Sequence, residues 1–62
     1  MPFVQIEMVE GRTLEQKRAL AKEVTDAIVH SLAVKPDAVR IIIRDMKKEN
    51  LSVAGKLRID QE

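Results

Sequence analysis

The hydrophobic pattern of this chain changes its period twice before residue 46. Over Phe3–Val9, apolar and polar side chains alternate, and a period of two is typical of a strand with one covered face. Apolar side chains then recur at helical spacing as far as Leu32, and a second apolar run follows. A strand, a helix and a strand in this order predict a β-α-β unit with two parallel strands and a right-handed crossover.

The helix is predicted over Thr13–Leu32, after a turn at Gly11. Thr13 and Gln16 have the spacing of a capping box, which satisfies two otherwise unpaired amides at a helix start. Pro36 disfavours helical geometry in the residue before it and so ends the helix upstream. The apolar stripe consists of Leu20, Val24, Ala27, Ile28 and Leu32. The charged side chains expected to face mostly away from the core are Lys17, Arg18, Lys22, Glu23 and Asp26.

The second strand is predicted over Val39–Asp45. Ile41–Ile43 are three consecutive apolar residues, so both faces of this strand are apolar in its middle, as in a strand covered on both sides. One helix covers only one face of the sheet, and the other face therefore needs another subunit. Beyond this strand, the turn residues Asn50 and Gly55 predict a short hairpin followed by a polar tail from Lys56.

The chain has 62 residues, which allows one domain of the α+β class over 1–62. In a domain of this size, the burial of apolar surface roughly balances the conformational entropy lost on folding, so a lone subunit is marginally stable. Cysteine is absent and His30 is the single histidine, which excludes disulfides and a clustered zinc site. Homo-oligomerisation remains as the source of further stability.

Charge and composition exclude several classes of partner. The net charge is +1, with both signs mixed along the chain, which gives little attraction to nucleic acid or to a membrane surface. Phe3 is the sole aromatic residue, so no stacking platform for bases exists. The chain shows neither a signal peptide nor an apolar stretch of transmembrane length. We therefore expect a cytoplasmic protein with no nucleic-acid or membrane partner.

Pro2 directly follows Met1, and initiator methionine is generally removed before a small residue such as proline. Removal leaves a secondary amine, and an α-amino group has an ordinary pKa of about 7.7–8.0. Apolar surroundings and nearby arginines both disfavour the charged form and lower this pKa, as a general base at neutral pH requires. Alternatively, Pro2 simply begins a strand, where its missing N–H is harmless.

Arginine side chains supply candidate anion-binding groups, because the guanidinium fork binds a carboxylate at two points. Arg12 lies just before the helix start, and Arg40 lies in an otherwise apolar strand. Arg44 is more simply a solvated charge. Glu7 is a weak candidate for a second acid or base, and His30 is a surface residue near the helix end, where a cation is favoured.

Together these residues resemble the 4-oxalocrotonate tautomerase family, over nearly the whole chain. The matching segments are Met1-Pro2-Phe3-Val4-Gln5-Ile6, Val9 before Glu10-Gly11-Arg12, Thr13-x-Glu15-Gln16-Lys17, Val39-Arg40-Ile41-Ile42-Ile43 and Val53-Ala54-Gly55-Lys56. The resemblance implies a β-α-β fold with a C-terminal hairpin, dimers with a four-stranded sheet, and a hexamer made of three dimers. It also implies cofactor-free keto–enol tautomerisation of unsaturated 2-oxo acids such as 2-hydroxymuconate, a small dicarboxylate.

The resemblance assigns roles to individual residues. Pro2, as the mature N-terminus, takes a proton from the dienol hydroxyl and returns it to carbon. Arg12 binds a substrate carboxylate, and Arg40 holds the 2-oxygen side and stabilises charge there. Leu51 occupies a substrate-contacting position where the family commonly has an aromatic residue, so the wall stays apolar but loses ring packing. The family assembles these groups from neighbouring subunits.

Two alternatives to this tautomerase hypothesis stay open. Relatives use the same proline to dehalogenate or decarboxylate small 3-carbon acids, with an added acidic residue for which Glu7 is the candidate here. The other alternative is a structural or binding oligomer of the same fold without catalysis, which the change at Leu51 and a retained Met1 favour.

Overall fold

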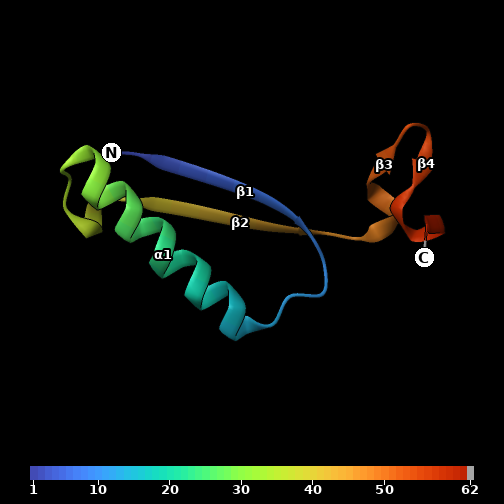
Figure 1. Cartoon of the computed structure of the whole chain (residues 1–62), viewed down its shortest axis with the longest axis horizontal. Helices are drawn as coiled ribbons and strands as arrows, with labels where there is room; N and C mark the ends of the chain where they lie inside the picture. The colour runs from blue at the N-terminus through green and yellow to red at the C-terminus, as the bar shows by residue number, and fades with distance from the viewer. Residues whose placement is uncertain (62) are drawn as a thin grey trace.

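The computed structural model describes residues 1–61 and contains a β-α-β unit followed by a small hairpin (Figure 1). The regular elements are β1 (Phe3–Val9), α1 (Leu14–Leu32), β2 (Arg40–Met46), β3 (Ser52–Val53) and β4 (Lys56–Leu57). Short 3₁₀ segments cover Pro36–Ala38, Lys48–Asn50 and Arg58–Gln61. The predicted strand–helix–strand order and the C-terminal hairpin are therefore confirmed. No helix among residues 1–61 is long and apolar enough to cross a membrane.

Strands β1 and β2 pair in parallel, from Phe3 opposite Arg40 to Val9 opposite Met46. The second strand begins one residue later than predicted. Val39 is excluded because its N–H donates to the Pro36 carbonyl at 3.1 Å, which closes the 3₁₀ turn before the strand begins. The chain thus enters β2 directly at Arg40.

The two faces of this sheet differ in composition and in cover. Alternate residues point to opposite faces of a strand, and the half-buried row lies beneath α1. Its half-buried members are Val4, Ile6, Met8, Ile41 and Ile43, and the row also includes the exposed, charged Asp45. The opposite face contains Phe3, Gln5, Glu7, Val9, Arg40, Ile42, Arg44 and Met46. In the single chain this second face lacks a cover, and Ile42 is 38% exposed on it.

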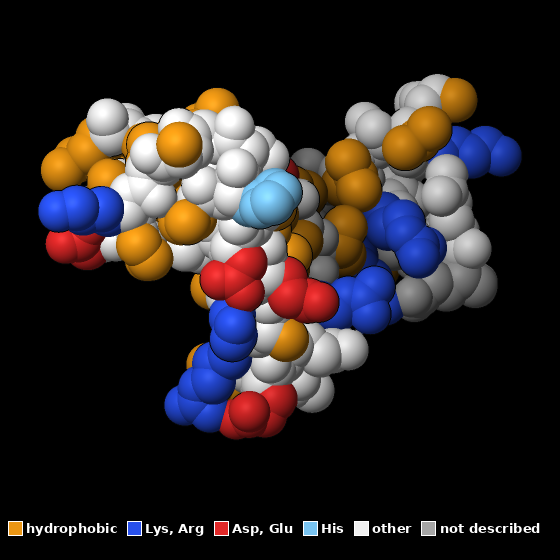
Figure 2. Space-filling view, turned by 60° about the vertical axis from the view of Figure 1, so that its left-hand side comes forward, with side chains coloured by type: hydrophobic (Ala, Val, Ile, Leu, Met, Phe, Trp, Pro, Cys, Tyr) orange, Lys and Arg blue, Asp and Glu red, His pale blue; other side chains and the backbone are white. Residues whose placement is uncertain are grey.

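None of the residues 1–61 is fully buried in the isolated chain. Phe3 is 66% exposed, and hydrophobic side chains lie at the surface of the β-α-β unit and of the C-terminal hairpin (Figure 2). Ile42, in the middle of Ile41–Ile43, is therefore exposed in the single chain, in agreement with the expectation that the second face needs another subunit. This is the result that the marginal burial of a 62-residue domain leads one to expect.

Helix α1 begins with the predicted capping box. The Thr13 N–H donates to Gln16 Oε1 at 2.9 Å, and the Gln16 N–H donates to Thr13 Oγ1 at 3.1 Å. The predicted stripe is confirmed at Leu20, Val24 and Ile28, which are half-buried. Ala27 and Leu32 are exposed instead, because the covered face of the helix includes Ala21 and Thr25. Lys17 was expected to face away, but it also lies on the covered face.

The helix ends at Ala33, which adopts the left-handed conformation with φ 56° and donates its N–H to the Val29 carbonyl. This conformation costs a residue with a Cβ roughly 1–2 kcal/mol, and glycine avoids most of that cost. We expect Ala33→Gly to raise the free energy of unfolding by about 0.5–1 kcal/mol, because glycine's added chain entropy offsets part of the gain. Thermal unfolding at fixed protein concentration measures this. Ala19→Gly, at an exposed position inside α1, should lower the free energy of unfolding by about 1 kcal/mol. A loss of stability in both variants would contradict the prediction.

The C-terminal arm, residues 47–61, projects from the end of β2 away from the helix (Figure 1). Ala54 and Gly55 both have positive φ, which is the requirement of a tight two-residue hairpin turn. The prediction of a polar tail from Lys56 is wrong, since Lys56–Leu57 forms β4. The turn reverses the chain, and the Arg58 N–H donates to the Leu51 carbonyl at 2.8 Å. Residue 62 lies outside the described residues.

Candidate active site

Pro2 and Arg40 lie together at one end of the β1–β2 sheet. The Arg40 N–H donates to the Pro2 carbonyl at 3.0 Å, which extends the parallel ladder by one bond beyond Phe3. Pro2 is half-buried, and Arg40 is exposed with its guanidinium donating to the Asp37 carbonyl. A cation therefore lies on the strand directly beside the one that carries Pro2.

Arg12 lies at the opposite end of the same sheet. It follows β1 and a glycine, Gly11, whose φ of 121° turns the chain toward the helix. The seven residues of β1 separate this end from Pro2, and at about 3.3 Å per residue they span about 23 Å. A single chain therefore does not bring Pro2 and Arg12 into one site.

Arg12 borders a groove of about 200 Å³ between the end of β1 and the start of α1. The groove is lined by Met8, Arg12, Gln16, Lys17 and Leu20. Lys17 is ion-paired with Asp45, whereas Arg12 has no hydrogen bond or ion pair within residues 1–61. The groove thus combines apolar walls with one guanidinium whose charge is available to an anion.

The contribution of Met8, Gln16 and Lys17 to this groove was not predicted from the sequence. The capping box was a usable indication for Gln16, because a residue at the third helical position lies near the residues that precede the helix. Lys17 was expected to face away from the core, and the placement of Met8 and Lys17 depends on how α1 crosses the sheet.

Leu51 lies in the C-terminal arm, beyond the end of β2. It is half-buried, and its carbonyl accepts the hydrogen bond from the Arg58 N–H. The arm and the N-terminus lie at opposite ends of the chain (Figure 1), whose longest extent is 43 Å. Leu51 is therefore on the side of Arg12 and far from Pro2 in the same subunit.

The two remaining candidates, Glu7 and His30, belong neither with Pro2 and Arg40 nor with Arg12 and Leu51. Glu7 lies on the uncovered face of the sheet and pairs with Arg44, with Arg44 Nη1 and Glu7 Oε2 3.4 Å apart. His30 is exposed in the last turn of α1. Among residues 1–61, no three histidine, cysteine or carboxylate side chains gather where they could hold a metal ion.

The chain matches the family model described as "Tautomerase enzyme" over residues 2–60. It is 52% identical over 58 residues to a probable tautomerase of Streptococcus pneumoniae serotype 4, which covers 94% of this chain and 97% of that protein. It is 40% identical over 62 residues to the 2-hydroxymuconate tautomerase of Bacillus subtilis, with all of both chains covered.

The fold agrees with this match. A heterohexameric 4-oxalocrotonate tautomerase from Chloroflexus aurantiacus superposes with a TM-score of 0.93 at 31% identity, with all of both chains covered. The family model covers the segment that holds Pro2, Arg12, Arg40 and Leu51 together with every strand of the fold. On sequence and on structure alike, the chain belongs to the tautomerase enzyme family.

Proposed function

We propose that this protein is an isomerase that interconverts the enol and keto forms of unsaturated 2-hydroxy and 2-oxo acids such as 2-hydroxymuconate, without a cofactor. The observation that supports this most directly is the pairing of Pro2 with Arg40 at 3.0 Å through the backbone. It places Pro2, a potential amine base, and the residue that carries the Arg40 guanidinium at the same end of the sheet in a tautomerase-family chain. The 1–62 chain acts as one tautomerase domain.

The proposed reaction moves one proton. After removal of Met1, the neutral Pro2 nitrogen accepts the proton of the 2-hydroxyl group as the C2–O bond becomes a carbonyl. The electron pair moves along the conjugated chain, and the protonated amine then returns the proton to a distal carbon. Atoms and charge balance, and the amine is regenerated. A neighbouring guanidinium and an apolar wall favour the neutral amine that begins this cycle.

The two arginines have different proposed roles. Arg40 binds the 2-oxygen side of the substrate and stabilises negative charge as it develops there. Arg12 binds the carboxylate at the other end of the substrate through its guanidinium, which has no partner in the described part of the chain. Leu51 forms an apolar wall that helps to exclude water.

We propose that the complete site forms between subunits of a homo-oligomer, a hexamer built as a trimer of dimers. Three features support this: the separation of about 23 Å between Pro2 and Arg12, the uncovered face of the sheet, and the absence of any fully buried residue in 1–61. The exposed apolar side chains of the C-terminal arm, which include Val53 at 59% and Ile59 at 49%, supply further surface for a neighbouring chain. The hexameric relative from Chloroflexus aurantiacus is consistent with this assembly.

The absence of cysteine suits a reducing compartment, and we propose that the enzyme acts in the cytoplasm.

An ultraviolet assay of 2-hydroxymuconate, run beside a 3-haloacrylate with halide detection, tests the function. We expect ketonisation of the dienol and no halide release, because Glu7 is paired with Arg44 rather than placed beside Pro2. Halide release without ketonisation would identify a dehalogenase instead. Failure with both substrates, in protein whose mass lacks Met1, would favour a non-catalytic oligomer.

Replacement of Arg12 by alanine is expected to raise KM for 2-hydroxymuconate about 10- to 100-fold and to change kcat less. Hydrogen bonds to a charged group contribute about 1.5–3 kcal/mol, and this carboxylate is bound equally in the ground and transition states. Steady-state kinetics measures the split. Arg18→Ala is the matched control, because Arg18 is an exposed residue of α1 that pairs with Glu15. A fall in kcat with unchanged KM would contradict the role of Arg12.

A further inference from the structure

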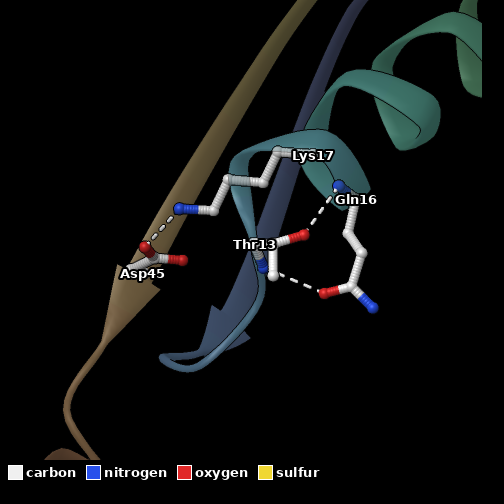
Figure 3. Close-up of polar contacts among 4 residues, drawn as sticks. All are labelled: Thr13, Gln16, Lys17 and Asp45. Atoms are coloured by element: carbon white, nitrogen blue, oxygen red, sulfur yellow. Dashed lines mark hydrogen bonds and ion pairs between the residues drawn. The ribbon is translucent and has the colours of Figure 1, made fainter.

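One ion pair connects the start of helix α1 to the end of strand β2. Lys17 Nζ lies 2.5 Å from Asp45 Oδ2, and the two side chains are 28% and 40% exposed (Figure 3). By contrast, the other two ion pairs of α1 within the described residues, Arg18–Glu15 and Lys22–Asp26, join residues of the same helix. The Lys17–Asp45 pair therefore links two separate elements, α1 and β2.

Asp45 occupies an unusual position in the sheet. It lies opposite Met8 in the parallel ladder, in the row of side chains beneath α1, where the other members are apolar. The Asp45 carboxylate is only partly shielded from water, at 40% exposure, and Lys17 Nζ is its recorded partner. This pairing holds the Lys17 ammonium over the last residues of β2.

The loop that carries Arg12 is anchored at both of its ends, close to the Lys17–Asp45 pair. At its beginning, the Glu10 N–H donates to the Met46 carbonyl at 2.8 Å, next to Asp45 on β2. At its end, the capping box fixes Thr13 (Figure 3). The Thr13 carbonyl also accepts the Lys17 N–H at 3.1 Å. The position of Arg12 relative to the sheet thus depends on how the first turn of α1 is held against the end of β2.

We propose that Lys17 is a positioning residue for Arg12, acting through its ion pair with Asp45. The pair fixes the first turn of α1 and so places the Arg12 guanidinium at the edge of the groove that both residues line. It also neutralises the charge of Lys17, so that the groove offers one uncompensated cation, suited to one carboxylate. This inference rests on the proposed function, in which Arg12 binds the substrate carboxylate remote from the reacting oxygen.

The test compares two substrates that differ only at the end that Arg12 binds. One is 2-hydroxymuconate, and the other is 2-hydroxypenta-2,4-dienoate, which lacks the remote carboxylate. We expect Lys17→Met and Asp45→Asn each to raise KM for the dicarboxylate about three- to fivefold, in line with the coupling of a partly exposed ion pair. KM for the monocarboxylate and kcat for both substrates should stay unchanged.

Two further variants separate positioning from general stability. Lys22→Met breaks the exposed Lys22–Asp26 pair of 2.9 Å on the same helix and should leave all constants unchanged. In an Arg12→Ala background, Lys17→Met should add no further increase in KM, because the two changes then affect one interaction. Asp45→Asn, a change of nearly equal size and shape, keeps the test available if Lys17→Met folds poorly.

Equal rises of KM for the two substrates, or an undiminished effect of Lys17→Met in the Arg12→Ala background, would overturn the positioning role. An active wild-type enzyme whose KM is insensitive to Lys17→Met would overturn this inference alone. Lack of tautomerase activity in correctly processed wild-type protein would overturn the proposed function and this inference with it.

Discussion

Blocking the Pro2 nitrogen is expected to lower kcat/KM for 2-hydroxymuconate by about 10²–10⁴-fold, the usual contribution of a positioned general base. An amide nitrogen has no available lone pair, so a peptide fused ahead of Pro2 removes the base while leaving its side chain in place. The experiment uses a cleavable extension that ends at Pro2. Cleavage to a free Pro2 terminus, verified by mass, should restore the activity.

The same extension placed after residue 62 serves as the control for this experiment and should leave kcat/KM unchanged. Pro2→Ala in processed protein gives a second measurement at native chain length, and it should also lose activity. The rate should fall with decreasing pH as the amine becomes protonated, since only the neutral amine accepts a proton. Full activity of the uncleaved extension, or of Pro2→Ala, would disprove the mechanism.

Arg40→Ala is expected to lower kcat by about 10²–10³-fold, with a smaller change in KM. A donor aimed at a developing oxyanion contributes this much because its interaction strengthens in the transition state. Stopped-flow and steady-state kinetics on 2-hydroxymuconate measure the change. Arg40→Lys should recover part of the rate, since it restores the charge without the guanidinium fork.

Arg44→Ala is the matched control for Arg40. Arg44 lies four residues along the same strand and the same face, and its partner there is Glu7. Its loss should change kcat little in variants that keep the assembly of the wild type by size-exclusion chromatography. If Arg40→Ala raised KM while kcat stayed constant, Arg40 would be a binding group rather than a stabiliser of developing charge.

The secondary structure was predictable because short-range patterns carry it. Period-two alternation located β1, and the Thr13–Gln16 capping box located the start of α1. The hydrophobic pattern does not locate the start of β2, because a backbone hydrogen bond from Val39 to Pro36 delays this strand by one residue. Nor does the pattern predict β4 at Lys56, where a tail was expected. Ala54 adopts a positive φ, which is rare for a residue other than glycine, and the resulting turn brings the chain back as a strand.

The site was predictable only as a set of residues. Pro2, Arg12, Arg40 and Leu51 were selected from their chemical types and from a family resemblance, neither of which depends on distance. The structure divides them into Pro2 with Arg40 at one end and Arg12 with Leu51 at the other. We propose that these residues come together only between subunits of an oligomer, and the pattern of residues along one chain does not describe contacts between subunits.

The sequence by itself determined the order of strand, helix and strand, the N-terminal cap of the helix, and the insufficiency of a lone 62-residue core. These properties follow from side-chain periodicity and from the balance of surface against chain entropy, which depend on neighbouring residues and on length. The tertiary structure alone decided that Asp45 lies beneath the helix, that Lys17 turns inward to meet it, and that Arg12 has no partner among residues 1–61 at the groove. Those outcomes depend on how the helix crosses the sheet, because Lys17 and Asp45 are 28 positions apart in the chain.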